Sequence, residues 1–496
     1  MKEIIRSEYS KLFYVGLIFI LLCSWFSLGY NHPDEHFQVL EFCNYKLGLS
    51  PASDLPWEFQ NKMRPALLPY CVFAVAKIFQ ALGAYNPFTI VFILRLLTGI
   101  ASWFITCRLC ILLFKNFKTK KAQKLLVLMS MFLWFMPYLD VRFSSENISG
   151  LLLLFGVYML LLNKEKDKDS ITAYLIAGFL FGIAFFIRIQ TAFALAGFAA
   201  WLIFIGKTQW KYLFIMAFSA LIAIGLNILL DSKFYGAPVL TPYNYYYQNI
   251  AMHRAEEYGV FPWWYYFVEF TIRAIPPLSL VLLVMFIAGI YKNARNVMVW
   301  TIVPLVVLHS LIGHKELRFL FPVTFIFIYV TALGFDYFLT KPNYKKIHKY
   351  IYIVSVIIMV PAFLYRTFVP AALAVNYFKY LQDNITKKNT VVFSLKTAPD
   401  YAATLLVVNY YRNPNVHSML LDSVAEIKDY LMEGGLDTAY YMNKKNLEFK
   451  YEIPGYKKEM VYTYIPSFVL KFDFNDWESR AQIWSIYRFS KEGVKK

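Results

Sequence analysis

Residues 296–339 read NVMVWTIVPLVVLHSLIGHKELRFLFPVTFIFIYVTALGFDYFL. Two apolar runs are joined in this stretch by one short polar turn, His314–Phe319. A helix that crosses a bilayer needs about 20 consecutive apolar residues. We therefore predict two membrane spans, 296–313 and 319–339, with the polar turn at the membrane surface between them.

The rest of the chain repeats this pattern. Of its 496 residues, 58% are hydrophobic and 17% are charged, whereas about a quarter of the residues in a soluble domain are charged. Further spans fit residues 12–28, 90–113, 123–143, 148–163, 171–189, 191–206, 212–230, 266–290 and 350–369. The sequence thus predicts a polytopic, all-α membrane protein with about eleven transmembrane helices.

The net charge of +18 does not predict nucleic-acid binding, because the basic residues lie in short loops between the apolar runs. These loops fall near residues 115–124, 164–168, 207–211, 292–295 and 341–349. By the positive-inside rule they face the cytoplasm together with the N-terminus. Counting residues 64–82 as a span would invert this pattern, so we predict an interfacial or re-entrant helix there.

With this topology, the non-cytoplasmic side receives a first outer loop (31–90), the loop 231–265, the turn at His314 and the whole tail. Residues 1–370 form the predicted membrane domain, and residues 371–496 form a small extracytoplasmic α/β domain. In the tail we expect strands at Thr390–Ser394 and Ser467–Phe472 and a helix near Val424–Met432.

Polar residues gather directly after the first span, where residues 31–41 read NHPDEHFQVLE. Pro33 starts a new helical turn, and helical spacing places Asp34, Gln38 and Glu41 on one face. Three interpretations are open. Asp34 could simply cap the helix, His32, Asp34 and His36 could bind a metal, or the carboxylates could serve catalysis.

The turn at His314 is the second polar group. His314, Lys315 and Arg318 are basic residues on a face where topology disfavours them, which indicates an anion-binding role, and a lipid phosphate is the anion available there. The alternative is that these charges are ordinary interfacial anchors.

Other ionisable and aromatic residues are predicted at or just below the outer surface. Glu146 and Arg188 lie at span ends, where buried charges usually line a site. The loop 231–265 carries Tyr245, His253 and Trp263, which could stack on sugar rings; the alternative is an aromatic belt at the membrane interface.

Taken together, these motifs resemble glycosyltransferase family 22. The resemblance rests on residues 32–38 with Glu41, on Trp57-Glu-Phe59 with Arg64 and Pro69, and on His314–Phe319 with Pro322, and it covers about residues 10–370. These GT-C enzymes transfer mannose from a polyprenyl (dolichyl) phosphate carrier in GPI-anchor and N-glycan assembly. There are two departures: Arg64-Pro65 stands where the family has Arg-Ser, and a motif expected of GPI enzymes in the C-terminal region is missing. The resemblance therefore leaves the acceptor open.

The resemblance implies an inverting transfer without a metal or another cofactor, on the non-cytoplasmic face. It assigns the catalytic base to Asp34; the neighbouring Glu35 is the competing candidate, and spacing along the chain does not decide between them. We expect His314, Lys315, Arg318 and Arg188 to bind the donor phosphate. The expected sugar- and acceptor-binding residues are His32, His36, Gln38, Glu41, Trp57, Arg64, Glu146, Tyr245, His253 and Trp263.

We therefore expect a glycosyltransferase that moves a hexose, with mannose favoured, from a polyprenyl-phosphate donor to a lipid-linked glycan acceptor. Its expected partners are these two lipids and the membrane, not nucleic acid. The high frequency of Lys, Ile, Asn, Phe and Tyr favours a bacterial inner membrane with a periplasmic site; the alternative is the endoplasmic reticulum lumen. A lipid-glycan ligase and a transporter are the alternative functions, although a transporter would place its ionisable residues near mid-membrane.

Overall fold

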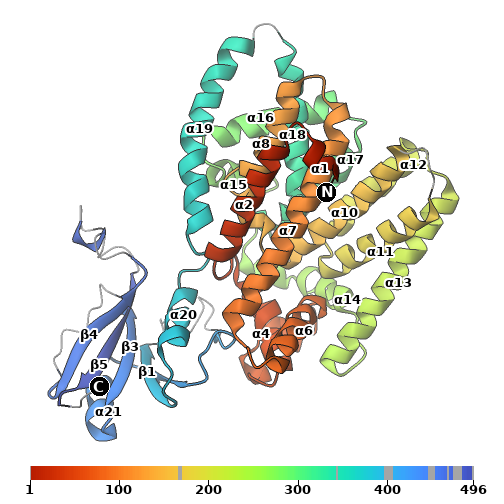
Figure 1. Cartoon of the computed structure of the whole chain (residues 1–496). Coiled ribbons are helices and arrows are strands. Elements are labelled where there is room, and N and C mark those ends of the chain that lie inside the picture. The colour runs from red at the N-terminus through yellow and green to blue at the C-terminus, as the bar shows by residue number, and fades with distance from the viewer. Residues whose placement is uncertain are drawn as a thin grey trace. The chain divides into compact units, whose positions relative to one another are not determined.

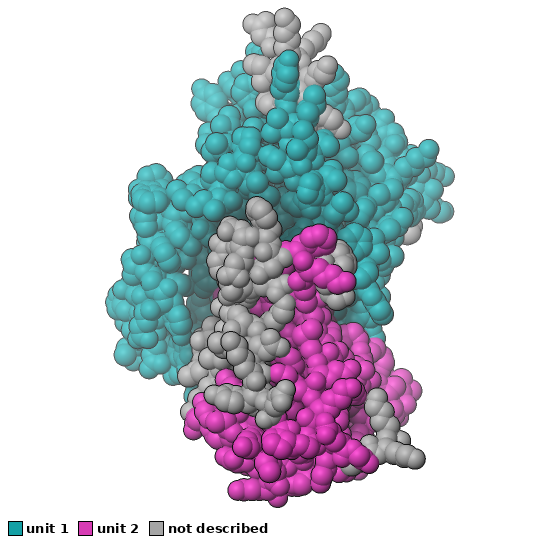
Figure 2. Space-filling model, turned by 90° about the vertical axis from the view of Figure 1, so that its left-hand side faces the viewer, with its two compact units in different colours: residues 1–27, 57–71, 91–369 teal, residues 28–56, 72–90, 370–496 magenta. Residues whose placement is uncertain are grey.

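The structure is a computed structural model that describes residues 2–165, 170–341, 344–395, 406–444, 453–465, 469–472, 477 and 483–493. The chain forms two compact units, which Figure 2 distinguishes by colour. Unit 1 comprises Met1–Ser27, Trp57–Cys71 and Val91–Val369, and unit 2 comprises Leu28–Pro56, Val72–Ile90 and Pro370–Lys496. The predicted first outer loop is therefore shared between the units.

Unit 1 is helical. Its longer helices are α2 (Ser10–Phe26), α7 (Pro87–Leu113), α8 (Lys120–Phe132), α10 (Ser145–Glu165), α11 (Ile171–Ile187), α12 (Thr191–Phe204), α13 (Trp210–Tyr235), α16 (Leu278–Lys292), α17 (Val297–Leu311), α18 (Thr324–Leu339) and α19 (Tyr344–Phe368). Shorter helices are α1 (Lys2–Arg6), α5 (Trp57–Gln60), α6 (Leu67–Ala81), α9 (Met136–Asp140), α14 (Thr241–Tyr246) and α15 (Tyr265–Arg273), and η6 (Leu317–Val323) is a 3-10 helix. Two of these helices are shared with unit 2, because unit 1 contains α6 only as far as Cys71 and α7 only from Val91.

Each predicted span contains at least one helix, because long apolar runs hold few residues that interrupt helical hydrogen bonding. Among the described residues, four helices are long and apolar enough to cross a membrane: Pro87–Asn116, Ser145–Glu165, Trp210–Tyr235 and Leu317–Leu339. Shorter apolar helices cover Ser10–Phe26, Leu67–Ala81, Ile171–Ile187, Thr191–Phe204, Leu278–Lys292, Val297–Leu311 and Ile353–Phe368. Lys166 and Lys168 of the predicted basic loops lie outside the described residues.

Two predicted spans are wrong as single helices. The run 266–290 is divided into α15 and α16 at Pro276-Pro277, because proline has no N–H to donate to the preceding turn. The run 123–143 ends its first helix at Phe132 and starts again at Met136, with Pro137 in the first turn of α9. Apolarity alone did not reveal these breaks.

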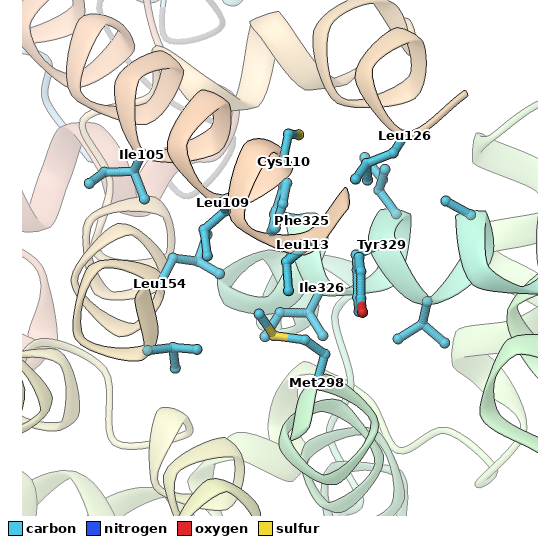
Figure 3. Packing of buried hydrophobic residues seen from close by; sticks show 14 of the residues in the cluster. Ile105, Leu109, Cys110, Leu113, Leu126, Leu154, Met298, Phe325, Ile326 and Tyr329 are labelled. Carbon is cyan, nitrogen blue, oxygen red and sulfur yellow. The ribbon is translucent and has the colours of Figure 1, made fainter. Parts of the chain in front are cut away.

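The core of unit 1 lies among α7, α8, α10, α17 and α18. Figure 3 shows Leu109 and Leu113 of α7 close to Phe325 and Ile326 of α18. Helices α10, α11 and α13 run side by side, and α16 packs along α18 (Figure 1). Glycines permit these close approaches, since a Cβ at Gly334 would collide with the carbonyl oxygen of Met285 on α16.

The beginning of α6 is fixed within unit 1 by α13. The Asp231 carboxylate accepts a hydrogen bond from the Ala66 N–H (2.7 Å) and another from the Thr241 hydroxyl (2.5 Å). This contact holds the start of a helix that follows directly after Arg64-Pro65. The interfacial placement of residues 64–82 remains a prediction.

Unit 2 contains a five-stranded sheet with the order β2-β1-β3-β5-β4. The strands are β1 (Thr390–Leu395), β2 (Val416–Leu421), β3 (Thr438–Lys444), β4 (Tyr456–Thr463) and β5 (Trp484–Lys491). Strand β1 pairs in parallel with β2 and β3, and β5 is antiparallel to both β3 and β4.

One helix packs against each face of this sheet. Side chains alternate along β1, so Phe393 contacts the cluster that includes α21 (Glu426–Gly434), while Val392 contacts the one that includes α20 (Val375–Asn384). The predicted strand at 390–394 and the predicted helix near 424–432 are therefore confirmed to within a few residues.

The predicted strand at Ser467–Phe472 is wrong. Val469–Lys471 is a 3-10 turn, and residues 466–468 lie outside the described residues. Strand propensity cannot distinguish a strand from a short apolar turn when the pairing partner is unknown. The free side of β5 is occupied by Tyr456–Thr463 instead.

Gly334→Ala should lower the free energy of unfolding of unit 1 by about 1 to 3 kcal/mol, since the new methyl group would separate α18 from α16. Gly225→Ala on α13 is the matched control, because its Cβ would meet nothing within 4 Å. We expect that control to keep or raise stability by about 0.5 to 1 kcal/mol. Thermal unfolding in detergent measures both, and equal shifts would contradict the packing described.

Candidate active site

The segment that carries Asp34 (residues 31–46, hereafter the Asp34 segment) is a chain of three short helices in unit 2. They are α3 (Pro33–Glu35), a π-helix η1 (His36–Leu40) and α4 (Glu41–Lys46). The side chain of His32 caps the first helix, because its Nδ1 accepts a hydrogen bond from the Asp34 N–H at 3.2 Å. His32 is therefore the N-cap residue of α3, and Asp34 lies in its first turn, where an acidic side chain suits the helix dipole.

The two candidate bases have different surroundings. The Glu35 carboxylate accepts a hydrogen bond from the Asn31 N–H at 3.2 Å and so holds the loop backbone. Asp34 Oδ1 lies 3.4 Å from His32 Nδ1, and the Asp34 side chain is 20% exposed. Both side chains are partly exposed, and the assignment of the base to Asp34 remains a prediction.

A π-helix at His36–Leu40 interrupts the helix that was predicted to carry Asp34, Gln38 and Glu41 on one face. Gln38 and Glu41 are 7% and 1% exposed, and His36 is 0% exposed. These three predicted sugar-binding residues point into the interior of unit 2.

The metal interpretation finds no support in the geometry. Within the part of the chain that the structure describes, no three His, Cys, Asp or Glu side chains come together as a metal site would require. His32 instead uses Nδ1 for the helix cap, and His36 donates from Nε2 to Glu41 at 2.7 Å.

The second group of polar residues lies in unit 1 at the ends of three helices. Its centre is the Glu146 carboxylate in the first turn of α10. Arg188 at the end of α11 lies 2.9 Å away (Nη2 to Oε1), and Arg318 in η6 lies 3.2 Å away (Nη1 to Oε1). We call Glu146, Arg188, His314, Glu316 and Arg318 the Glu146 cluster.

Arg188 retains hydrogen-bonding capacity although it is only 4% exposed. Its Nε and Nη2 make no hydrogen bond to any described residue, because the contact with Glu146 is close but poorly aligned. A buried guanidinium with unused N–H groups is suited to an anionic ligand. The sequence-based prediction of a phosphate-binding role for Arg188 remains a prediction.

Glu316 orients the other cations of the cluster. Its carboxylate accepts from Arg318 Nε (2.6 Å) and Nη2 (3.0 Å) and from His314 Nε2 (3.1 Å). His314 Nδ1 lies 3.0 Å from the Gly259 carbonyl oxygen, which only accepts, so both ring nitrogens donate. The hydrogen bond to Glu316 raises the pKa of His314, which favours the charged imidazolium.

Phe319 forms an aromatic platform beneath this cluster. The guanidinium carbons of Arg188 and Arg318 lie 5.1 and 5.3 Å from its ring centroid. The ring of His309, a buried residue of α17, lies 5.1 Å from it and is hydrogen-bonded to the Tyr266 hydroxyl at 2.9 Å. Sequence reasoning missed His309, although a histidine inside an apolar run is an available signal.

Lys315 has a different environment from its neighbours. It is 2% exposed, and its ammonium donates to the carbonyl oxygens of Phe261 (2.7 Å), Gly313 (3.3 Å) and Ile312. Burial lowers its pKa. Because an ammonium has three hydrogens, these carbonyls use its full capacity, and the arrangement favours a structural role at the end of α17.

The remaining predicted sugar-binding residues divide into two groups. Arg64 lies over the Tyr245 ring (5.3 Å), and the Tyr245 hydroxyl accepts from Gln190 (2.7 Å), two residues after Arg188. Trp57 lies under Arg254 (5.2 Å). In contrast, Trp263 is 62% exposed and the His253 side chain is 70% exposed, paired with Glu256.

Comparisons with known proteins identify the family. A model of the Alg9-like mannosyltransferase family matches residues 12–403. The chain belongs to this family, and the predicted resemblance is confirmed. It is a glycosyltransferase of the mannosyltransferase type and an integral membrane protein.

Curated relatives agree with this assignment. GPI mannosyltransferase 3 of Candida albicans is 24% identical over 436 residues, which are 84% of this chain and 79% of the relative. GPI alpha-1,2-mannosyltransferase 3 of Bos taurus is 22% identical over 62% of this chain, and that of Homo sapiens is 24% identical over 59%. The chain spans about half the length of these two relatives, 56% and 51% respectively.

Solved structures show the same fold. The crystal structure of ArnT from Cupriavidus metallidurans bound to undecaprenyl phosphate aligns over 97% of this chain and 98% of that chain, with a TM-score of 0.55 and 10% identity. The apo structure gives a TM-score of 0.52. The predicted GT-C fold, a helical membrane part followed by a small α/β part, is thereby confirmed.

The contacts of Lys315 and Arg318 predict that substitution of Lys315 lowers stability, whereas substitution of Arg318 weakens binding of polyprenyl phosphate. Lys315→Met should lower the free energy of unfolding by about 1 to 3 kcal/mol, because buried carbonyls lose their donor. Its affinity for polyprenyl phosphate should stay within about twofold, since no ammonium hydrogen is left for a phosphate. Arg318→Gln should weaken that affinity roughly 10- to 100-fold.

Thermal unfolding and equilibrium binding of polyprenyl phosphate in nanodiscs measure the two effects on the same preparations. If Lys315→Met weakened binding as much as Arg318→Gln while its thermal stability stayed unchanged, the structural role of Lys315 would be excluded.

Proposed function

We propose that this protein is an inverting, polyprenyl-phosphate-sugar-dependent mannosyltransferase. It transfers mannose to a lipid-linked glycan on the non-cytoplasmic face of the membrane, without a metal or another cofactor. The Glu146 cluster is the observation that supports this most strongly. Two arginines and one imidazolium share two carboxylates there, which leaves a surplus of positive charge in a largely buried site.

The surplus charge suits the leaving group of the proposed reaction. As the bond between the anomeric carbon and the phosphate oxygen breaks, the electron pair stays on the phosphate. Cations that already surround the phosphate stabilise this charge without reorganising, which is the largest single contribution in many enzymes. The unused N–H groups of Arg188 and the guanidinium of Arg318 would bind the phosphate oxygens.

The other half of the reaction needs a base. The acceptor hydroxyl attacks the anomeric carbon from the face opposite the phosphate, and its proton passes to the Asp34 carboxylate. One displacement of this kind inverts the configuration at the anomeric carbon. Asp34 lies in unit 2 and the Glu146 cluster in unit 1.

The names of the relatives guide the choice of sugar and acceptor. GPI mannosyltransferases from fungi and mammals are among the proteins similar to this chain, which supports mannose as the sugar and a glycolipid as the acceptor. The bound lipid named for the ArnT structure is undecaprenyl phosphate, which supports a polyprenyl carrier. A bacterial inner membrane with a periplasmic site is the proposed location, with the endoplasmic reticulum lumen as the alternative.

Asp34→Asn should abolish transfer while the protein still folds and binds the donor. Loss of a general base typically costs about 100- to 10,000-fold in rate. The helix cap comes from His32 and is untouched by this change. Turnover of purified protein with polyprenyl-phosphate mannose and a lipid-linked acceptor measures the effect, and the product is identified by mass spectrometry.

Glu35→Gln is the matched control. Glu35 accepts a hydrogen bond from the Asn31 N–H, and an amide oxygen can still accept that bond. The variant should therefore retain a transfer rate within about tenfold of wild type. Treatment of the wild type with EDTA should change nothing. An Asp34→Asn enzyme that keeps most of its turnover, or a wild type silenced by EDTA and restored by a divalent ion, would contradict the mechanism.

A further inference from the structure

We infer that Glu41 is a positioning residue. Through Glu41, residues 409–413 of the tail (hereafter the Asn409 segment) hold the Asp34 segment in the conformation that catalysis requires. Glu41 was predicted to bind sugar, and no function was predicted for the tail. The inference rests on the proposed function, because it concerns the segment that carries the proposed base.

The Glu41 carboxylate joins the two segments within unit 2. Its Oε1 accepts three hydrogen bonds, from His36 Nε2 (2.7 Å), the Asn409 N–H (2.7 Å) and the Tyr410 N–H (2.9 Å). Glu41 is 1% exposed, and a buried carboxylate is stable only when it is paired in this way. A residue so enclosed by the protein has no surface to offer a sugar.

Aromatic stacking strengthens the same junction. The Tyr411 ring lies between His36, at a centroid distance of 5.5 Å and an interplanar angle of 22°, and Phe88, at 4.9 Å and 26°. Tyr411 and His36 are both 0% exposed. The His36 ring is therefore fixed by Glu41 at its edge and by Tyr411 on its face.

Further hydrogen bonds connect the Asn409 segment to the sheet. The Asn413 side chain donates to the carbonyl oxygens of Leu381 and Ile385 at the end of α20, at 2.8 and 2.9 Å. Tyr377 of α20 donates to the Trp484 carbonyl oxygen of β5 at 2.5 Å. A continuous chain of contacts thus runs from the α/β sheet to His36.

The tail also holds the chain just before the Asp34 segment. The Ala372 N–H donates to the Leu28 carbonyl oxygen at 3.1 Å. Gly29 follows with φ +88°, and a Cβ there would lie 2.7 Å from the Cβ of Ala372. Residues 28–41 are therefore fixed at both ends by contacts with residues beyond 370.

Asp34 lies between these two fixed points, immediately before the π-helix that begins at His36. A general base works only within hydrogen-bond reach of its proton, and displacements of about 1 Å can cost about 100-fold in rate. Glu41 would therefore act on catalysis through the backbone, without touching substrate. Its partners in the tail lie beyond residue 403, where the family match ends.

Glu41→Met in the full-length protein tests this inference, because it removes the acceptor oxygen and keeps the length of the side chain. Asp54→Ala is the matched control, since Asp54 accepts from the Asn409 side chain at 2.8 Å and so contacts the same tail residue without bonding the His36 π-helix. We expect Glu41→Met to lower kcat about 10- to 100-fold, with KM for donor and acceptor within about threefold. Asp54→Ala should stay within about twofold of wild type in both. Glu41→Gln, whose amide oxygen can still accept the three hydrogen bonds, should lie closer to wild type.

Hydrogen exchange of the substrate-free proteins, followed by mass spectrometry, supplies a readout that does not depend on activity. Amides in residues 34–46 and 406–413 should exchange at least about tenfold faster in Glu41→Met than in wild type or Asp54→Ala. His36→Gln keeps an amide group that can donate to Glu41. Its amide exchange rates and its turnover should therefore be closer to those of wild type than are those of His36→Ala.

Unchanged exchange in Glu41→Met together with a raised acceptor KM would overturn the inference and restore Glu41 as a sugar ligand. Equal acceleration of exchange in Asp54→Ala would also overturn it, because the effect would then belong to the tail contact in general. Failure of Asp34 as the base is recognised separately, by an active Asp34→Asn enzyme with wild-type exchange.

Discussion

The buried Glu146 carboxylate between two guanidinium groups is the interaction on which the proposed donor site depends. Glu146 lies at the positive end of the α10 dipole and Arg188 at the negative end of the α11 dipole, so each charge suits its helix end. Removing one partner of such a buried pair typically costs about 3 to 5 kcal/mol, because the other charge is left uncompensated. The same carboxylate also fixes Arg318, which places both guanidinium groups around Phe319.

Close helix packing makes this arrangement possible. A Cβ at Gly150 would lie 2.7 Å from the backbone of Pro322, so only glycine lets α10 approach η6 this closely. Glu146 is one turn before Gly150, and Arg318 is one turn before Pro322. The contact between Gly150 and the Pro322 backbone therefore sets the distance between the Glu146 carboxylate and the Arg318 guanidinium.

Much of this could be predicted from the sequence, for reasons that differ between residues. Apolar runs predicted the helices, and the predicted outer position of basic residues drew attention to Arg318 and Arg188. Patterns along the chain could not show that Glu41 faces the tail, because its partners are 368 and 369 residues away. Spacing also failed at His36–Leu40, where a π-helix replaces the expected α-helix, and at Lys315, whose charge is used by backbone carbonyls.

The proposed reaction is one displacement, with cations at the phosphate and a single carboxylate base on the other side of the sugar. The anomeric configuration of the product tests this most directly. Purified protein would be supplied with polyprenyl-phosphate mannose of known configuration and a lipid-linked acceptor, and the new glycosidic bond examined by NMR. The account predicts the configuration opposite to that of the donor. A product that retains the donor configuration would require a covalent or otherwise two-step reaction and would contradict it.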